Sequence, residues 1–192
     1  QGYLNFEVPI IEELVEQYRF LTMRYDIVVT NPPYMGSNGM EAKLSKYVKK
    51  FYPNTKSDLF AVFMDVSSNI TKNYGYYAMI NQQSWMFLIS YEKLREVILK
   101  DKTIINMVHT GARTFPEIGG EVVQNTSFIF LNNAINSYHG RYVRLVGFNN
   151  AEEMIGNLNN IHNNFYVTHN KFKLIPGSPI AYWVSENFLK MY

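Results

Sequence analysis

The stretch Tyr25-Asp26-Ile27-Val28-Val29-Thr30-Asn31-Pro32-Pro33-Tyr34 decides the fold class of this 192-residue chain. Its first six residues are rich in β-branched side chains, which favour a strand. The two prolines fix their own φ angles and push Asn31 and Pro32 out of the helical region, so the turn is stiff. The sequence therefore predicts a strand that ends in a carboxamide, two fixed carbonyls and a phenol ring. Ligands bind at that edge of an open α/β sheet.

Strand and helix patterns alternate after this turn, and this alternation predicts a doubly wound α/β sheet. Apolar residues at helical spacing predict helices over 11–21, 44–51, 57–70 and 90–98, and strands are predicted over 76–81, 104–109, 122–131 and 141–146. Three serines are predicted helix N-caps, namely Ser57, Ser90 and Ser178, the last followed by Pro179 at the first position of a terminal helix. The Asn-rich segment 149–170 has little apolar periodicity and is predicted to be a linker or an irregular surface segment.

The amino-acid composition limits the class of protein and the kinds of site that this chain can contain. Hydrophobic residues make up 47% of the chain, as in a globular domain, and cysteine is absent, which excludes disulfides and thiolate metal sites. The formal net charge of +2 is too small to indicate nucleic-acid binding by itself. No apolar run approaches the ~18 residues of a membrane span, and no histidine has metal-ligand spacing, so neither a membrane nor a metal site is predicted. Because the chain begins with Gln1, we expect it to be a piece of a longer protein.

The turn has the groups needed to bind a planar base through an exocyclic amine. The lone pair of such an amine is delocalised into the ring, so the nitrogen is a poor nucleophile. Two acceptors, the Asn31 side-chain oxygen and the Pro32 carbonyl, would draw it toward tetrahedral geometry and stabilise the developing positive charge. Tyr34 offers a stacking face, and because Tyr34→Phe keeps this face, we expect that variant to be mild. The alternative is that the Pro-Pro pair only ends a strand, as in many loops.

The same turn resembles the catalytic motif of S-adenosylmethionine-dependent N6-adenine DNA methyltransferases of the gamma arrangement. The resemblance covers about residues 25–132 and includes Lys56–Phe63, Tyr77–Ile80, Ser84–Leu88, Ser90–Arg95, Phe115-Pro116 and Val122–Phe128. The sequence Asn-Pro-Pro-Tyr-Met-Gly, and later Ile175–Pro179, is most similar to the corresponding sequences of the large methyltransferases of BREX-type phage defence (PglX-like) and of type IIG restriction-modification enzymes.

This resemblance implies roles for particular residues. Asn31, Pro32, Pro33 and Tyr34 would form the catalytic turn, and Tyr34 and Phe115 would stack on either face of a flipped adenine. Asn31 and Phe63 would contact the cofactor, S-adenosylmethionine. For Phe63 the sequence favours core packing instead, and a buried loop anchor is the alternative for Phe115.

The resemblance also implies where the chain lies in a larger enzyme. Residues 1–148 would be the carboxyl-terminal, catalytic half of a Rossmann-like methyltransferase domain that lacks the cofactor-binding amino-terminal strands. Residues 149–192 would be a linker and the start of a target-recognition region, toward which Arg141 and Arg144 lead. No glycine-bearing cofactor loop precedes Asn31, so we expect the isolated chain to be inactive, to bind S-adenosylmethionine negligibly and to self-associate through an exposed apolar edge.

The implied partners are double-stranded DNA and other proteins of a defence system, in the cytoplasm and without a membrane. Two alternatives stay open at this point. One is an N-methyltransferase that acts on a release-factor glutamine or a ribosomal RNA guanine, because both present an sp² nitrogen that needs the same two acceptors. The other is a non-catalytic, methyltransferase-like module for DNA binding or scaffolding.

Overall fold

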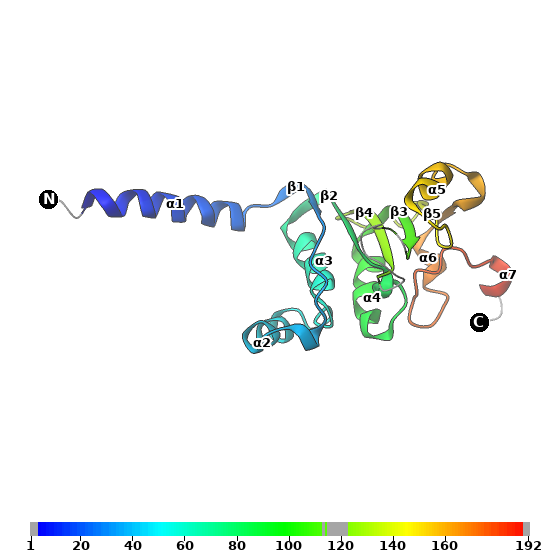
Figure 1. Cartoon of the computed structure of the whole chain (residues 1–192), viewed down its shortest axis with the longest axis horizontal. Helices are drawn as coiled ribbons and strands as arrows, with labels where there is room; N and C mark the ends of the chain where they lie inside the picture. Colours follow the sequence, from blue (N-terminus) through cyan, green and yellow to red (C-terminus); the bar gives the residue numbers. More distant parts are fainter. Residues whose placement is uncertain (1–3, 113, 115–122, 190–192) are drawn as a thin grey trace.

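The computed structural model describes residues 4–112, 114 and 123–189 and contains a six-stranded sheet in the order β1-β2-β4-β3-β5-β6 (Figure 1). The strands are β1 (Tyr25–Thr30), β2 (Thr71–Gln82), β3 (Thr103–Gly111), β4 (Asn125–Leu131), β5 (Gly140–Arg144) and β6 (Asn164–Val167). The longer helices are α1 (Leu4–Thr22), α2 (Ala42–Phe51), α3 (Leu59–Ile70), α4 (Glu92–Asp101) and α5 (Ala151–Asn157). Shorter helical elements are η1 (Ser37–Gly39), η2 (Gln83–Met86), η3 (Ile89–Tyr91), η4 (Ile161–Asn163), α6 (His169–Phe172) and α7 (Glu186–Leu189).

The sheet is mixed. β1 pairs parallel with β2 and β3 pairs parallel with β5, whereas β4 lies antiparallel between β2 and β3. Gly75 lets β1 approach β2 closely, because a Cβ at this position would lie 2.7 Å from the Asp26 carbonyl oxygen. The predicted α/β class is confirmed, and the carboxyl ends of β1, β2, β3 and β5 meet at one edge of the sheet together with the start of β4.

One face of the sheet is covered by α3 and α4, and the main core forms there. Phe60 and Met64 of α3 and Ile98 of α4 are buried against Tyr77 and Phe128 of the strands. At about 25 cal/mol per Å² of buried apolar surface, a core of this kind is the main stabilising contribution to such a domain. The helices therefore fix β1 and β2, which position the candidate site.

The opposite face is open near β1. β1 is an edge strand, and its Ile27 and Val29 side chains are 66% and 72% exposed. The predicted amino-terminal helix is present as α1, but it projects away from the sheet (Figure 1), and Leu14 and Leu21 of its apolar face are 58% and 80% exposed. The helical period at 11–21 thus predicted the helix correctly, while its apolar face has no covering element among the described residues.

Several boundaries differ from the predictions. The N-cap of α3 is Asp58, not Ser57, because the Asp58 carboxylate accepts the Phe60 amide hydrogen. Tyr91 occupies the cap position of α4 in place of Ser90, since the short helix η3 leads directly into α4. No helix starts at Ser178, whose φ of 47° is left-handed; the terminal helix α7 begins only at Glu186.

The Asn-rich segment also differs from expectation. Residues 151–157 are helical, and β6 pairs with β5 through Tyr142↔Phe165. Phe172 and Tyr182, further along, are buried in the main core. The prediction of a linker or an irregular surface segment over 149–170 is therefore wrong for 151–157, which are helical, and for β6, which pairing with β5 holds on the sheet. The assignment of 149–192 to the start of a target-recognition region stays a prediction. In the described part of the chain, no helix has the length and apolar character of a membrane span.

Candidate functional site

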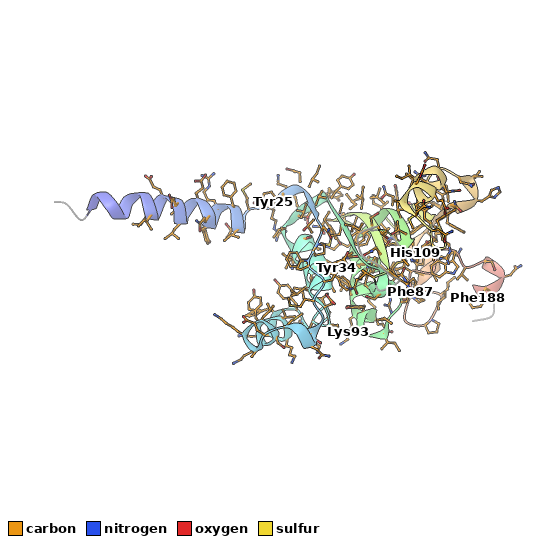
Figure 2. All side chains as sticks on the ribbon, in the orientation of Figure 1. Tyr25, Tyr34, Phe87, Lys93, His109 and Phe188 are labelled. Carbon is orange, nitrogen blue, oxygen red and sulfur yellow. The ribbon has the colours of Figure 1, made fainter. Side chains whose placement is uncertain are left out.

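The Asn31–Tyr34 turn lies where the sequence predicted, at the carboxyl end of β1. Its neighbour β2 runs parallel and ends at Gln82, so the turn stands at the edge where the parallel strand ends meet. Asn31 and Pro33 are exposed, Pro32 is buried and Tyr34 is half-buried. Figure 2 shows Tyr34 beside α3, with Phe87 and His109 further along the sheet.

Two contacts fix the Tyr34 ring. Its hydroxyl donates a hydrogen bond to the Asn125 side-chain oxygen at 3.0 Å. Its ring packs edge-on against Phe60, with centroids 6.3 Å apart and an interplanar angle of 82°. Burial, and then the nearby Asp58 carboxylate, raise the pKa of Tyr34 above its usual value, so the hydroxyl stays protonated and acts as the donor. The ring therefore has a defined orientation before any base arrives.

Asn125 is the residue that sequence reasoning missed. It is the first residue of β4 and is 1% exposed. Its side-chain nitrogen donates to the Val123 carbonyl at 3.4 Å, and its backbone carbonyl accepts a hydrogen bond from the Thr110 hydroxyl at 3.0 Å. The bond to Val123 orients the side-chain amide with its oxygen toward Tyr34, and the bond from Thr110 fixes the Asn125 backbone. In the sequence Asn125 lies inside the predicted strand 122–131, and no local pattern marks it as a partner of Tyr34.

Asp58 ties the exit of the turn to α3. Its carboxylate accepts hydrogen bonds from the Met35 amide at 3.0 Å and from the Phe60 amide at 3.2 Å. The Leu59 amide also donates to the Met35 carbonyl at 3.0 Å. An acidic N-cap is favourable for the helix as well. One side chain thus starts α3 and anchors the residue that follows Tyr34.

The two acceptors proposed from the sequence are available. Within the described part of the chain, neither the Asn31 side chain nor the Pro32 carbonyl makes an internal hydrogen bond. Asn31 borders an open hollow of about 570 Å³ on the uncovered side of the sheet. The hollow is lined by Val29, Thr30, Asn31, Ala78, Met79, Ile80, Asn106, Ser127, Phe128 and Ile129. None of these residues is charged.

Phe63, another predicted site residue, is not brought into this arrangement. Phe63 is partly buried on α3 and packs against the main core, and it does not line the hollow. Its contact with a cofactor stays a prediction. Phe115 falls outside the described residues, so its stacking role stays a prediction too. Among the described residues, no group of three acidic or histidine side chains could hold a metal ion.

Comparisons with known proteins agree with this geometry. Residues 6–115 match the family model of the Eco57I restriction-modification methylase. The chain is 48% identical to the adenine-specific methyltransferase BrxX of Escherichia coli O9:H4 (strain HS), over 93% of this chain and 15% of that protein. It is 45% identical to the adenine-specific methyltransferase PglX of Lacticaseibacillus casei (strain Zhang), over 99% of this chain and 17% of that protein. The chain thus spans about a sixth of the length of these relatives.

A similar fold occurs in solved structures. The cryo-electron microscopy structure of a DrdV–DNA complex superposes with a TM-score of 0.62 at 16% identity, over 91% of this chain and 20% of that one. At this identity the similarity concerns the fold alone. The resemblance to PglX-like methyltransferases that the motifs indicated is confirmed by the 45–48% identical relatives.

Proposed function

This chain belongs to the Eco57I restriction-modification methylase family, and on that basis we propose that the full-length protein methylates the N6 amine of adenine in DNA, in restriction-modification or phage defence. The observation that supports this most is the Asn31–Tyr34 turn. It presents two acceptors that make no hydrogen bond to the described residues, beside a ring that Asn125 holds in place. The two relatives named as adenine-specific methyltransferases support adenine over a glutamine amide or a guanine.

The residues of the turn have distinct tasks in this reaction. The Asn31 side-chain oxygen and the Pro32 carbonyl accept hydrogen bonds from the two N–H groups of the adenine amine, so the nitrogen becomes tetrahedral and its lone pair leaves conjugation with the ring. Both acceptors then stabilise the positive charge that develops on nitrogen. Tyr34 stacks on the base, which must be rotated out of the duplex to reach the turn. A strong base is unnecessary, because the methylated ammonium is acidic and loses its proton to water.

S-adenosylmethionine is the methyl donor that we propose. The exposed Asn31 and the apolar hollow beside it fit the part of the donor that carries the transferred methyl group. The hollow has no carboxylate for the ribose hydroxyls of the donor, so its described lining does not fit the adenosine part. We therefore propose that Asn31, together with Phe63 of α3, makes only a minor part of the contacts to the cofactor.

The proposed reaction is tested by long-read modification sequencing. DNA from cells that express the full-length protein, with and without its neighbouring genes, is compared with DNA from cells that express the Asn31→Ala variant. We expect N6-methyladenine at a defined sequence motif, and its loss in the variant. Absence of methylation with the wild-type protein in both settings would contradict the proposed function. Dependence on the neighbouring genes would identify the partner proteins.

We predict that this chain by itself binds S-adenosylmethionine too weakly to measure by calorimetric titration, with a Kd above about 1 mM, which corresponds to roughly 4 kcal/mol. The reason is the missing polar partner for the adenosine in the hollow. The full-length protein, titrated under the same conditions, is the positive control. Micromolar binding by the isolated chain would show that the described residues hold the cofactor after all.

We also predict that the isolated chain self-associates through the open side of the sheet. Ile27 and Val29 on the edge strand are mostly exposed and apolar, and edge strands of this kind pair readily. Sedimentation velocity should show concentration-dependent oligomers that shift toward monomer in the Ile27→Thr/Val29→Thr double variant. Tyr166→Thr, on the opposite edge strand β6 and 64% exposed, is the matched control. A clean monomer of the wild-type chain at high concentration contradicts the prediction.

A further inference from the structure

A second cluster of side chains lies further along the sheet from the catalytic turn. The guanidinium carbon of Arg144, at the end of β5, sits 4.6 Å from the ring centroid of Trp183. The Trp183 ring is in turn 5.7 Å from Phe87, and Phe87 is 6.1 Å from His109 at the end of β3. Figure 2 shows Phe87 and His109 side by side. Neither the strand pattern nor the catalytic role proposed above accounts for this cluster.

No carboxylate among the described residues forms an ion pair with Arg144. Lys72–Asp26 is the only ion pair between described residues, and apart from Trp183, Arg144 interacts with the Tyr182 side chain. Arg141, three residues earlier on the same strand, differs. Its guanidinium donates to the side-chain oxygens of Asn164 and Asn159, at 2.6 and 3.3 Å, and to the Leu158 carbonyl at 3.3 Å. One arginine of β5 thus holds the chain together, and the other retains donors for a ligand.

The neighbouring histidine does not compete for an anion. His109 is 3% exposed, and its ring nitrogens contact the Tyr182 hydroxyl, at 3.0 Å, and the Gln83 amide oxygen. Burial, and then the charge of Arg144, lower the pKa of His109 to about 4, so the ring is neutral near pH 7. Arg144 is therefore the one fixed charge of this cluster. A guanidinium stacked on an indole ring keeps its N–H edges free and loses little side-chain freedom on binding.

The sheet places this charge close to the turn. His109 is paired with Arg144 across β3 and β5, and Gly111 with Asn125 across β3 and β4. Asn125 in turn holds Tyr34. From Asn125 to Arg144 is two strand spacings of about 4.8 Å each across the sheet and two residues of about 3.3 Å each along β3, or roughly 12 Å in all. That is the length of about three to four nucleotides of one DNA strand at about 3.4 Å each.

We propose that Arg144, held against Trp183, binds a backbone phosphate of DNA within a few nucleotides of the adenine that Tyr34 receives. The proposal rests on the proposed function, since it needs DNA at the turn. Arginine matches the geometry of a phosphate with two parallel hydrogen bonds, and phosphates are the anions that DNA presents at this distance from a base. The contact would set the register of the strand on the enzyme without reading its sequence.

The test measures DNA affinity of the full-length protein against salt, by fluorescence anisotropy with a duplex that contains its methylated motif. Arg144→Gln should weaken binding several-fold at low salt and reduce the slope of log K against log salt by about one, the value for one lost phosphate contact. Arg144→Lys should keep the slope and bind with intermediate affinity. Arg141→Gln removes the same charge from the same strand and should leave the slope unchanged. Trp183→Leu should weaken binding without a change of slope.

The outcomes separate this assignment from the proposed function. Wild-type binding with an unchanged slope in Arg144→Gln would overturn the assignment alone, and Arg144 would then serve to pack Trp183. An equal loss of slope in Arg141→Gln would also overturn it, because only net charge would matter. If the wild-type protein neither methylated nor bound DNA, the proposed function itself would be overturned. Thermal unfolding of each variant shows which of them keep the wild-type fold. If Arg144→Gln does not fold, the intermediate affinity expected of Arg144→Lys tests the assignment in its place.

Discussion

Replacing Asn31 with alanine in the full-length protein is expected to lower kcat for adenine methylation by on the order of 10²-fold or more. The Asn31 oxygen is one of two acceptors that strengthen as charge develops on the amine, so its loss is felt in the transition state. Loss of one such preorganised hydrogen bond costs about 2.7–4 kcal/mol. Binding of DNA should change little, because Tyr34 and the backbone contacts remain.

The structure also predicts that this variant folds normally. Asn31 is exposed, and its side chain has no hydrogen bond within the described residues. Single-turnover methyl transfer at saturating DNA measures the rate, and thermal unfolding checks the fold. Asn38→Ala, which truncates another exposed asparagine in η1 shortly after the turn, is the matched control and should react at the wild-type rate. A rate within tenfold of wild type for Asn31→Ala would contradict the acceptor role.

The part of the site that follows from local chemistry could be predicted from the sequence. β-Branched residues and two prolines determine a strand and a stiff turn within ten residues, and the structure has both at the predicted positions. The class of the fold follows similarly from alternating periods of apolar residues. The antiparallel position of β4 between β2 and β3 could not be predicted this way, because a strand pattern carries no direction.

The features that could not be predicted correctly depend on residues that are distant in the chain. Ser57 and Asp58 are both good N-caps, and Asp58 occupies the cap where its carboxylate also accepts the Met35 amide, 23 residues away. β6 has only four residues in an Asn-rich context, yet Phe165 packs against Tyr182, which is buried in the main core. The bond between Tyr34 and Asn125 spans 91 residues. No local pattern indicates such pairs, so the support of the site appears only in the fold.

This bond changes the expectation for Tyr34. Tyr34→Ala removes a stacking face, about 1–3 kcal/mol, and a buried hydrogen bond, about 1 kcal/mol, so kcat/KM should fall by roughly 10²-fold. Tyr34→Phe keeps the face, and the sequence alone predicts a mild effect. The structure predicts more, because the Asn125 oxygen would lose its donor in a side chain that is 1% exposed. A cost of about 1–3 kcal/mol follows, and we expect roughly a tenfold loss of kcat/KM.

A double-mutant cycle decides whether the bond positions the ring. If it does, Asn125→Ala should lower kcat/KM as Tyr34→Phe does, and the double variant should be little worse than either, with a coupling of about 1 kcal/mol. Capture of a 2-aminopurine at the target position, read by fluorescence, should weaken in step, which a purely structural role would not require. Tyr25→Phe is the matched control, since its hydroxyl donates to the Phe20 carbonyl at 2.7 Å at the far end of β1. Additive losses would mean that Tyr34 and Asn125 act separately, and the ring would owe its orientation to Phe60 alone.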